Sequence, residues 1–245
     1  MGVSPHSPTR RAKTSPAEPR HRARDDGWHD VISGLGGALI MVSAFATPFL
    51  RRWRNRWGID RATVRARFPG DDLIDEPRWQ WTHAIDVRVP AAEVWPWIAQ
   101  IGADRAGFYS YQWLENLAGC GIDNAEVLHP EWEATTGDDL VLHPEAPALR
   151  IVEVKADRYL VAHGAPDPRL DLTTDRWVAA SWLFLVRPLA AHRCQVVSRY
   201  RVATSPHLRM RLQYGPAFVE PIGFAMDRRM LKGIKRRAER TWNRR

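Results

Sequence analysis

The stretch WTHAIDVRVPAAEVWPWIAQIG, residues 81–102, joins the two patterns that indicate the fold. Apolar and polar residues alternate over 81–89, which predicts a half-buried strand. Its inward face carries Trp81, His83, Ile85, Val87 and Val89. Pro90 ends this strand, and the following residues predict a helix that stops at Gly102. The inward face of that helix carries Val94, Trp95, Ile98 and Ile101.

Further strands and one long helix follow in the C-terminal half of the chain. The predicted strands are 138–143, 149–155, 158–163, 179–187 and 193–202, joined by short loops such as 156–157, as in an antiparallel meander. A helix is expected from about Pro221. Its apolar arc holds Met226, Met230, Leu231, Ile234 and Ala238. This order of elements predicts an α+β fold.

The N-terminal part has a different composition. Residues 1–26 are rich in Pro, Ser and Arg, which predicts a disordered basic tail. Residues 31–50 carry no charge and are long enough to cross a bilayer. We expect 27–56 to form a membrane segment with an Arg/Trp flank and 57–245 to form the folded domain. The flank is part of RRWRNRWG, residues 51–58. A buried core helix and a signal peptide are the alternatives for the uncharged run, although the lead-in is long for a signal.

Charge is distributed unevenly along the chain. The net charge of +8 comes from the flanks, because residues 68–227 carry 14 Lys/Arg against 22 Asp/Glu. An acidic body disfavours a nucleic-acid partner. The stronger basic excess lies after the uncharged run, which favours a single-pass protein of the cell membrane with its body in the cytoplasm. Cys120 and Cys194 form no CxxC pair, so neither a disulfide framework nor a cysteine-rich metal site is indicated.

Several segments resemble one superfamily. They are VWPWIAQIG, GFYSYQWLENL, HPEW, GDDLVL, SWLFLV and MLKGIKRRAE. In these the chain is similar, over roughly 57–242, to bacterial members of the SRPBCC superfamily. That START-related group includes polyketide cyclases/dehydrases and lipid-transfer proteins, and several close variants carry an N-terminal hydrophobic segment. The resemblance implies a helix-grip fold, in which a curved antiparallel sheet wraps the long C-terminal helix around a mostly apolar cavity.

The resemblance places the segment 107–119 at the mouth of that cavity. Aromatic side chains with polar tips suit a half-wet rim, and the candidates are Tyr109, Tyr111 and Trp113. The alternative is that they close the end of the sheet. Glu115 and Asn116 either face the cavity or cap nearby backbone.

Other candidates lie on later loops and strands. His129 and Glu131 offer an acid/base pair, with Trp132 beside them, although simple loop packing around Trp132 is the alternative. Trp182 is the candidate for the cavity floor, or else an ordinary core residue. His83 and His163 lie on strands, where a hydrogen-bonded core histidine is the usual finding.

The expected function is a membrane-tethered binding domain for a hydrophobic or amphipathic small molecule of the lipid, polyketide or isoprenoid class. One alternative is a cyclase/dehydratase-type enzyme using Glu115, Glu131 or a histidine as general acid or base. A second is an interaction or regulatory module docking through the basic C-terminal helix. No His-x-x-x-His spacing, P-loop, GxSxG or strand-linked GxGxxG is present, so no metal or cofactor is expected.

Overall fold

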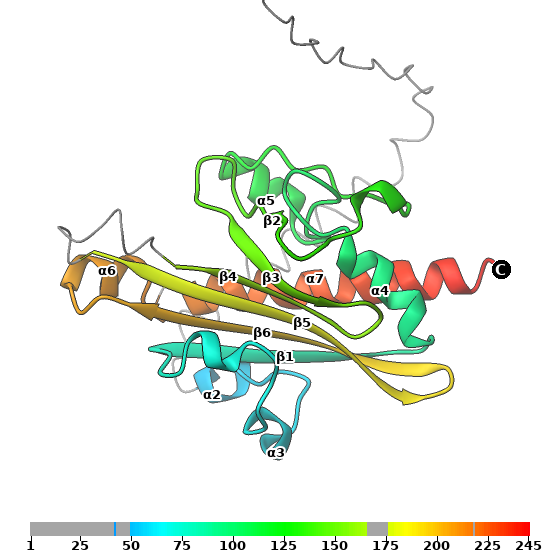
Figure 1. Ribbon diagram of the computed structural model, residues 1–245, viewed down its shortest axis with the longest axis horizontal. Coiled ribbons are helices and arrows are strands. Elements are labelled where there is room, and N and C mark those ends of the chain that lie inside the picture. Colours follow the sequence, from blue (N-terminus) through cyan, green and yellow to red (C-terminus); the bar gives the residue numbers. More distant parts are fainter. Residues whose placement is uncertain (1–41, 43–49, 166–175, 218) are drawn as a thin grey trace, which may run out of the picture.

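A computed structural model describes residues 42, 50–165, 176–217 and 219–245 (Figure 1). The tail 1–26 and nearly all of the uncharged run 31–50 lie outside the described residues. Within the described residues, none of the helices has both the length and the apolar character needed to span a membrane.

Six strands form one antiparallel sheet in the order β1-β6-β5-β4-β3-β2. Their bounds are β1 Trp79–Val87, β2 Asp139–Leu140, β3 Leu149–Lys155, β4 Tyr159–Gly164, β5 Val178–Ala190 and β6 Arg193–Thr204. The predicted meander is confirmed. The strand predicted at 138–143 is shorter than expected, because the carbonyl of Val141 accepts a hydrogen bond from Ala103 N instead of extending the ladder (2.9 Å).

The helices are short except for the last. Their bounds are α2 Arg51–Arg54, α3 Arg61–Val64, α4 Ala91–Ala99, α5 Gln112–Leu117, α6 Leu208–Gln213 and α7 Val219–Trp242, with 3₁₀ turns η2 Asp71–Leu73 and η3 Pro130–Trp132. The helix α7 runs along one face of the sheet beside α4 (Figure 1). A six-stranded antiparallel sheet with this C-terminal helix is the helix-grip arrangement.

The main core lies between the sheet and the helices α4 and α7. The predicted inward residues of α4 are buried, as are Met230, Leu231, Ile234 and Ala238 of α7. On β5, Phe184 and Val186 belong to this core. Burying such side chains contributes roughly 1.5–3 kcal/mol each.

A second, smaller core explains why β5 is apolar on both faces. Leu183 packs with Phe68, Ala84, Val161 and Val197 on the other side of the sheet. The segment before β1 covers this side, so the sheet is buried on both faces there.

Polar contacts hold that N-terminal segment in place. The carbonyls of Asn55 and Trp57 accept hydrogen bonds from Thr82 N (2.8 Å) and Ala84 N (2.9 Å). The N-terminal segment thereby covers the edge of β1 that has no partner strand within the described parts of the chain. Contacts with the body therefore begin before the predicted domain start at residue 57. The outer-face arginines of β6 anchor η2, because Arg199 Nε (2.8 Å) and Arg201 Nη1 (3.0 Å) both donate to Asp71 Oδ1.

Candidate functional site

A cavity of about 330 Å³ lies between the sheet, the helix α5 and the first half of α7. Most of its lining is apolar. The aromatic side chains of this lining are Trp81, Phe108, Trp182 and Tyr200, and its aliphatic side chains include Leu114 and Met226. The exposed residues Ala118 and Ile222 are also part of the lining, so the cavity reaches the surface beside α5.

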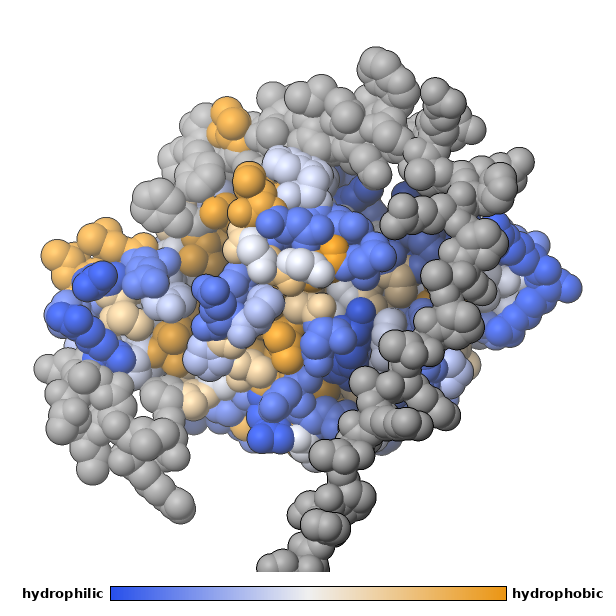
Figure 2. Space-filling view, turned by 90° about the horizontal axis from the view of Figure 1, so that it is seen from above, coloured by the Kyte–Doolittle hydropathy of each residue, from blue (hydrophilic) through white to orange (hydrophobic). Residues whose placement is uncertain are grey.

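The surface next to α5 carries exposed apolar side chains. Leu117 is 77% exposed and Ile222 is 42% exposed. Figure 2 shows this side of the molecule, where apolar groups lie between charged ones and gather at the end that carries α6. Leu208 and Leu212 of α6 contribute exposed apolar surface there.

Glu115 is the polar residue of the apolar wall formed by α5. It is 6% exposed, and its Oε2 atom has no hydrogen-bond partner among the described residues. Burial raises the pKa of its carboxyl group from 4.5 to about 7. Burial and the nearby charge of Glu115 also raise the pKa of the Cys120 thiol, another lining group. The cavity therefore holds a carboxyl group that can be neutral or ionised near neutral pH.

A chain of buried polar groups lies behind the opposite wall. Trp182 Nε1 donates to Ser198 Oγ (2.9 Å), and Ser198 Oγ donates to Asp227 Oδ1 (2.6 Å). The other oxygen of Asp227 lies 2.5 Å from His83 Nδ1. A carboxylate can only accept, and the tautomer of His83 with its proton on Nδ1 matches this geometry.

This hydrogen-bond network does not have the geometry of a nucleophilic triad. Ser198 bonds to the carboxylate and not to the imidazole, so His83 is not placed to take its proton. Of the four residues, Trp182 and Asp227 line the cavity. His83 is therefore a hydrogen-bonded core histidine, the usual finding expected for it.

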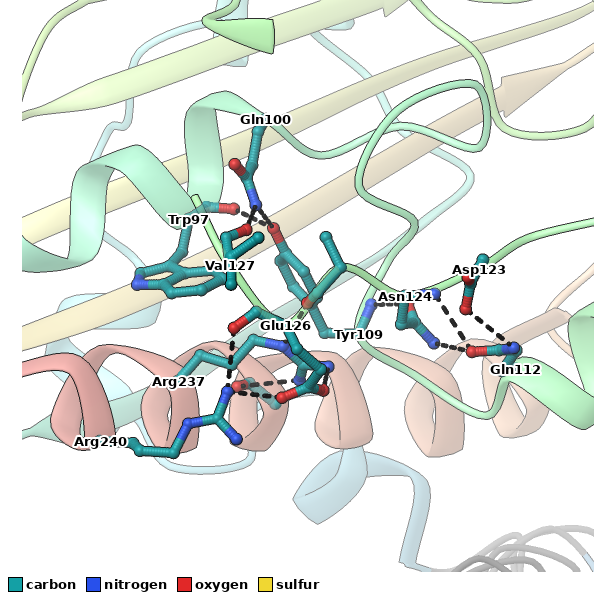
Figure 3. A network of polar contacts seen from close by, with 12 residues as sticks. Trp97, Gln100, Tyr109, Gln112, Asp123, Asn124, Glu126, Val127, Arg237 and Arg240 are labelled. Atoms are coloured by element: carbon teal, nitrogen blue, oxygen red, sulfur yellow. Dashed lines mark hydrogen bonds and ion pairs between the residues drawn. The ribbon is translucent and has the colours of Figure 1, made fainter. Parts of the chain in front are cut away.

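Tyr109 lies outside the cavity, in a polar network that shapes the segment before and after α5 (Figure 3). Its hydroxyl donates to Trp97 O (3.0 Å) and accepts from Gln100 Nε2 (2.8 Å). Its backbone N donates to Asn124 Oδ1 (2.5 Å), and the Arg237 guanidinium lies 4.6 Å from its ring centroid. These contacts stabilise a left-handed backbone at Tyr109 (φ 56°), which is unfavourable for a residue other than glycine.

The same network ties α7 to the loop after α5. Arg237 Nε donates to Ala125 O (2.8 Å), and its Nη2 pairs with Glu126. Arg240 Nη2 lies 2.5 Å from the other oxygen of Glu126 (Figure 3). The contacts of Tyr109 are thus with α4, α7 and the loop after α5, and not with the cavity.

The remaining residues predicted around α5 also lie outside the cavity lining. Tyr111 is buried beneath Arg229, whose guanidinium lies 5.5 Å from the ring centroid. Trp113 is 46% exposed. Asn116 bonds to both backbone groups of Ile122, accepting from its N (2.6 Å) and donating to its O (2.9 Å). It therefore caps nearby backbone, the alternative stated for it.

The HPEW segment lies apart from the cavity as well. His129 stacks on Trp132, with ring centroids 4.1 Å apart, and its Nδ1 lies 3.2 Å from Glu131 Oε1. Glu131 is exposed, so this pair faces solvent. His163 lies half-buried on β4, where burial lowers the pKa of its imidazole.

Sequence reasoning missed Ser110 and Asp227. Asp227 lies three residues before Met230 and four before Leu231, so helical spacing places it on the apolar arc of α7. An acidic residue on an apolar arc indicates a buried polar contact. The arginines that follow Asp227 in the sequence made it look like part of the charged face. Ser110 gave no comparable signal.

Comparisons with known proteins give low similarity. No family model and no curated protein matches this chain. Among solved structures, a hypothetical protein from Helicobacter pylori is 12% identical with a TM-score of 0.42, covering 69% of this chain and 94% of that one. A START superfamily protein from Mycobacterium smegmatis is 11% identical with a TM-score of 0.31, covering 66% and 98%. An aromatase/cyclase from Streptomyces sp. R1128 is 15% identical with a TM-score of 0.28, covering 66% and 94%. At these scores the likenesses carry no argument about family or ligand.

Proposed function

We propose that this chain belongs to the SRPBCC superfamily and binds a hydrophobic or amphipathic small molecule of the lipid, polyketide or isoprenoid class. The observation that carries the proposal is the cavity of about 330 Å³, whose apolar wall holds the buried carboxyl group of Glu115, with one oxygen that has no partner among the described residues. Ligand pockets are commonly apolar with a few polar groups that orient the ligand. Glu115 would hydrogen-bond a hydroxyl or other donor on an otherwise apolar ligand.

Two variants of α5 test this proposal with a matched control. Leu114 lines the cavity, whereas Leu117 lies on the same helix outside the lining and is 77% exposed. Leu114→Trp should fill part of the cavity and reduce the amount of apolar ligand that copurifies, while Leu117→Trp should leave it unchanged. The measurement is mass spectrometry of solvent extracts from equal amounts of each folded variant. Equal ligand in both would contradict binding in this cavity.

An enzyme of cyclase/dehydratase type is the second candidate, and Glu115 favours it. A carboxyl group with a pKa of about 7 can both accept and donate a proton near neutral pH. Its Oε2 atom has no hydrogen-bond partner in the part of the chain that the structure describes, which suits contact with a substrate. Glu115→Gln should then lower turnover of the copurified compound by about 10²–10⁴ with binding retained. If the cavity only binds its ligand, neither the wild type nor Glu115→Gln forms a product, so the two proteins do not differ in this assay.

We also propose that residues 31–50 attach the protein to the cell membrane as a single pass, with the folded body in the cytoplasm. The support is the uncharged run followed directly by RRWRNRWG. The full chain should sediment with membranes in the absence of detergent and stay there after a high-salt wash. Recovery in the supernatant would contradict this attachment.

A further inference from the structure

A second hollow lies on the molecule away from the apolar cavity, beside β1, where α2 and α3 pack (Figure 1). It has a volume of about 490 Å³. We call it the arginine cleft, after the side chains that dominate its lining: Arg51, Arg52, Arg56, Arg61 and Arg65. Asn55, Gln80 and Thr82 add polar groups, and none of the described lining residues is acidic.

Most of this positive charge is uncompensated. Arg51 is the exception, because its Nε and Nη2 atoms both bond Glu220 at 2.6 Å. The side chains of Arg52, Arg56, Arg61 and Arg65 form no hydrogen bond or ion pair with any described residue. Arg52 lies on α2 and Arg61 on α3, and Arg56 and Arg65 follow those helices, so four like charges line one hollow and repel one another. A bound anion would remove this repulsion.

The scaffold of the cleft is fixed by contacts that do not use these four arginines. Asn55 and Trp57 pair with the edge of β1 through their carbonyls. Asp60 accepts from Thr63 N (2.9 Å) at the start of α3, and Arg199 Nη1 donates to Val64 O (3.1 Å) at its end. The two arginine-bearing segments are therefore held in place before any ligand arrives, which reduces the cost of ordering the site.

A fixed neighbour also orients Gln80. Its Oε1 accepts from Arg201 Nη1 (3.0 Å), so its amide NH₂ group remains as a donor. A lining of guanidinium groups and a free amide donor matches an acceptor-only ligand with several oxygens.

We propose that the arginine cleft binds a phosphate-bearing anion with at least two negative charges. Guanidinium groups bind phosphate through paired, charge-assisted hydrogen bonds. Arginines from two segments around one hollow suit a ligand that can be bonded from both sides. This site is separate from the apolar cavity, so the proposal stands or falls independently of the ligand bound there. The phosphate can belong to a soluble compound or to a lipid head group.

The test uses the full chain and sodium pyrophosphate as probe, with calorimetry at constant ionic strength. The cleft variant replaces Arg52, Arg56, Arg61 and Arg65 with Gln. The control variant makes the same change at Arg209, Arg211, Arg236 and Arg244, which removes equal charge from exposed sites outside the cleft. We expect saturable binding at a single site, weakened at least about tenfold in the cleft variant and by less than about twofold in the control.

A second arm identifies the source of the phosphate. Vesicles of cardiolipin, whose head group carries two phosphates, in phosphatidylcholine are compared with phosphatidylcholine alone, using the same variants in a flotation assay. Cleft-dependent vesicle binding without pyrophosphate binding assigns the site to a lipid head group, and the reverse assigns it to a soluble phosphate compound. Single variants Arg61→Gln and Arg65→Gln, both at exposed positions, guard against misfolding of the fourfold variant. Equal losses in cleft and control variants, or no cleft-dependent binding in either arm, would overturn the proposal.

Discussion

The stability of the protein should depend on pH through Glu115, and Glu115→Gln should remove that dependence. Burial raises the pKa of this carboxyl group from 4.5 to about 7 in the folded protein. Between these values the folded state retains a proton that the unfolded state has lost. Stability therefore falls as pH rises through this window, and levels off above pH 7.

The expected size of this effect follows from the pKa difference. At about 1.4 kcal/mol per pKa unit, the rise corresponds to about 3 kcal/mol. The wild type should lose about that much free energy of unfolding, relative to Glu115→Gln, between pH 4.5 and pH 8. The variant is nearly isosteric and has no titrating group at this position, so other ionisable groups cancel in the comparison.

The assay is urea unfolding of both proteins at a series of pH values, with the difference in unfolding free energy plotted against pH. Alkylation of Cys120 gives a local check, since removing the charge of Glu115 should lower the pKa of that thiol and speed its reaction. Cys194 is fully buried and serves as an internal reference. A constant difference across this pH range would refute the argument that Glu115 is a desolvated acid.

Three further substitutions test the packing of the fold. Met230→Asp places a carboxylate where the side chain is 1% exposed, and thermal unfolding should show a loss of several kcal/mol; an unchanged midpoint would exclude α7 from the core. Gly233→Ala should destabilise the protein by roughly 1–3 kcal/mol in urea unfolding, because the new methyl group would lie 2.4 Å from Tyr109 O. Helix propensity alone predicts a stabilisation of about 1 kcal/mol, so a more stable variant would contradict this close contact. Asp71→Asn removes the shared carboxylate of the buried Arg199 and Arg201, and should cost about 3–5 kcal/mol at pH 7; a loss below about 1 kcal/mol would show that Asp71 does not anchor η2.

Much of the fold could be predicted from local patterns. The alternation before Pro90 and the apolar arc of α7 are properties of one segment each, and the structure confirms the strand and the arc. The strand is not half-buried as predicted, because Thr82 and Ala84 on its outer face are each 1% exposed and Ala84 packs with Phe68. The apolar character of both faces of β5 was visible, but its cause was not. It depends on residues such as Phe68 that are distant in sequence and pack on the outer face.

The candidate site was harder to predict, because side-chain direction within a loop has no simple period. Tyr109 and Glu115 are close in sequence, yet the left-handed backbone at Tyr109 directs it into the Arg237 network while Glu115 faces the cavity. Asp227 was missed because its partners His83 and Ser198 lie on two other elements. Such a cluster becomes visible only when strands and helix are assembled.

The most direct test of the central proposal is mass spectrometry of what the natively purified full chain carries, with Leu114→Trp and Leu117→Trp measured beside it. We predict an apolar or amphipathic compound in the wild type and in Leu117→Trp, and its loss from Leu114→Trp. The two tryptophan variants should unfold at similar temperatures, so that the loss reports on the cavity and not on folding. Absence of any such compound from the wild type, or equal retention by both variants, would contradict the proposal that this cavity binds an apolar ligand.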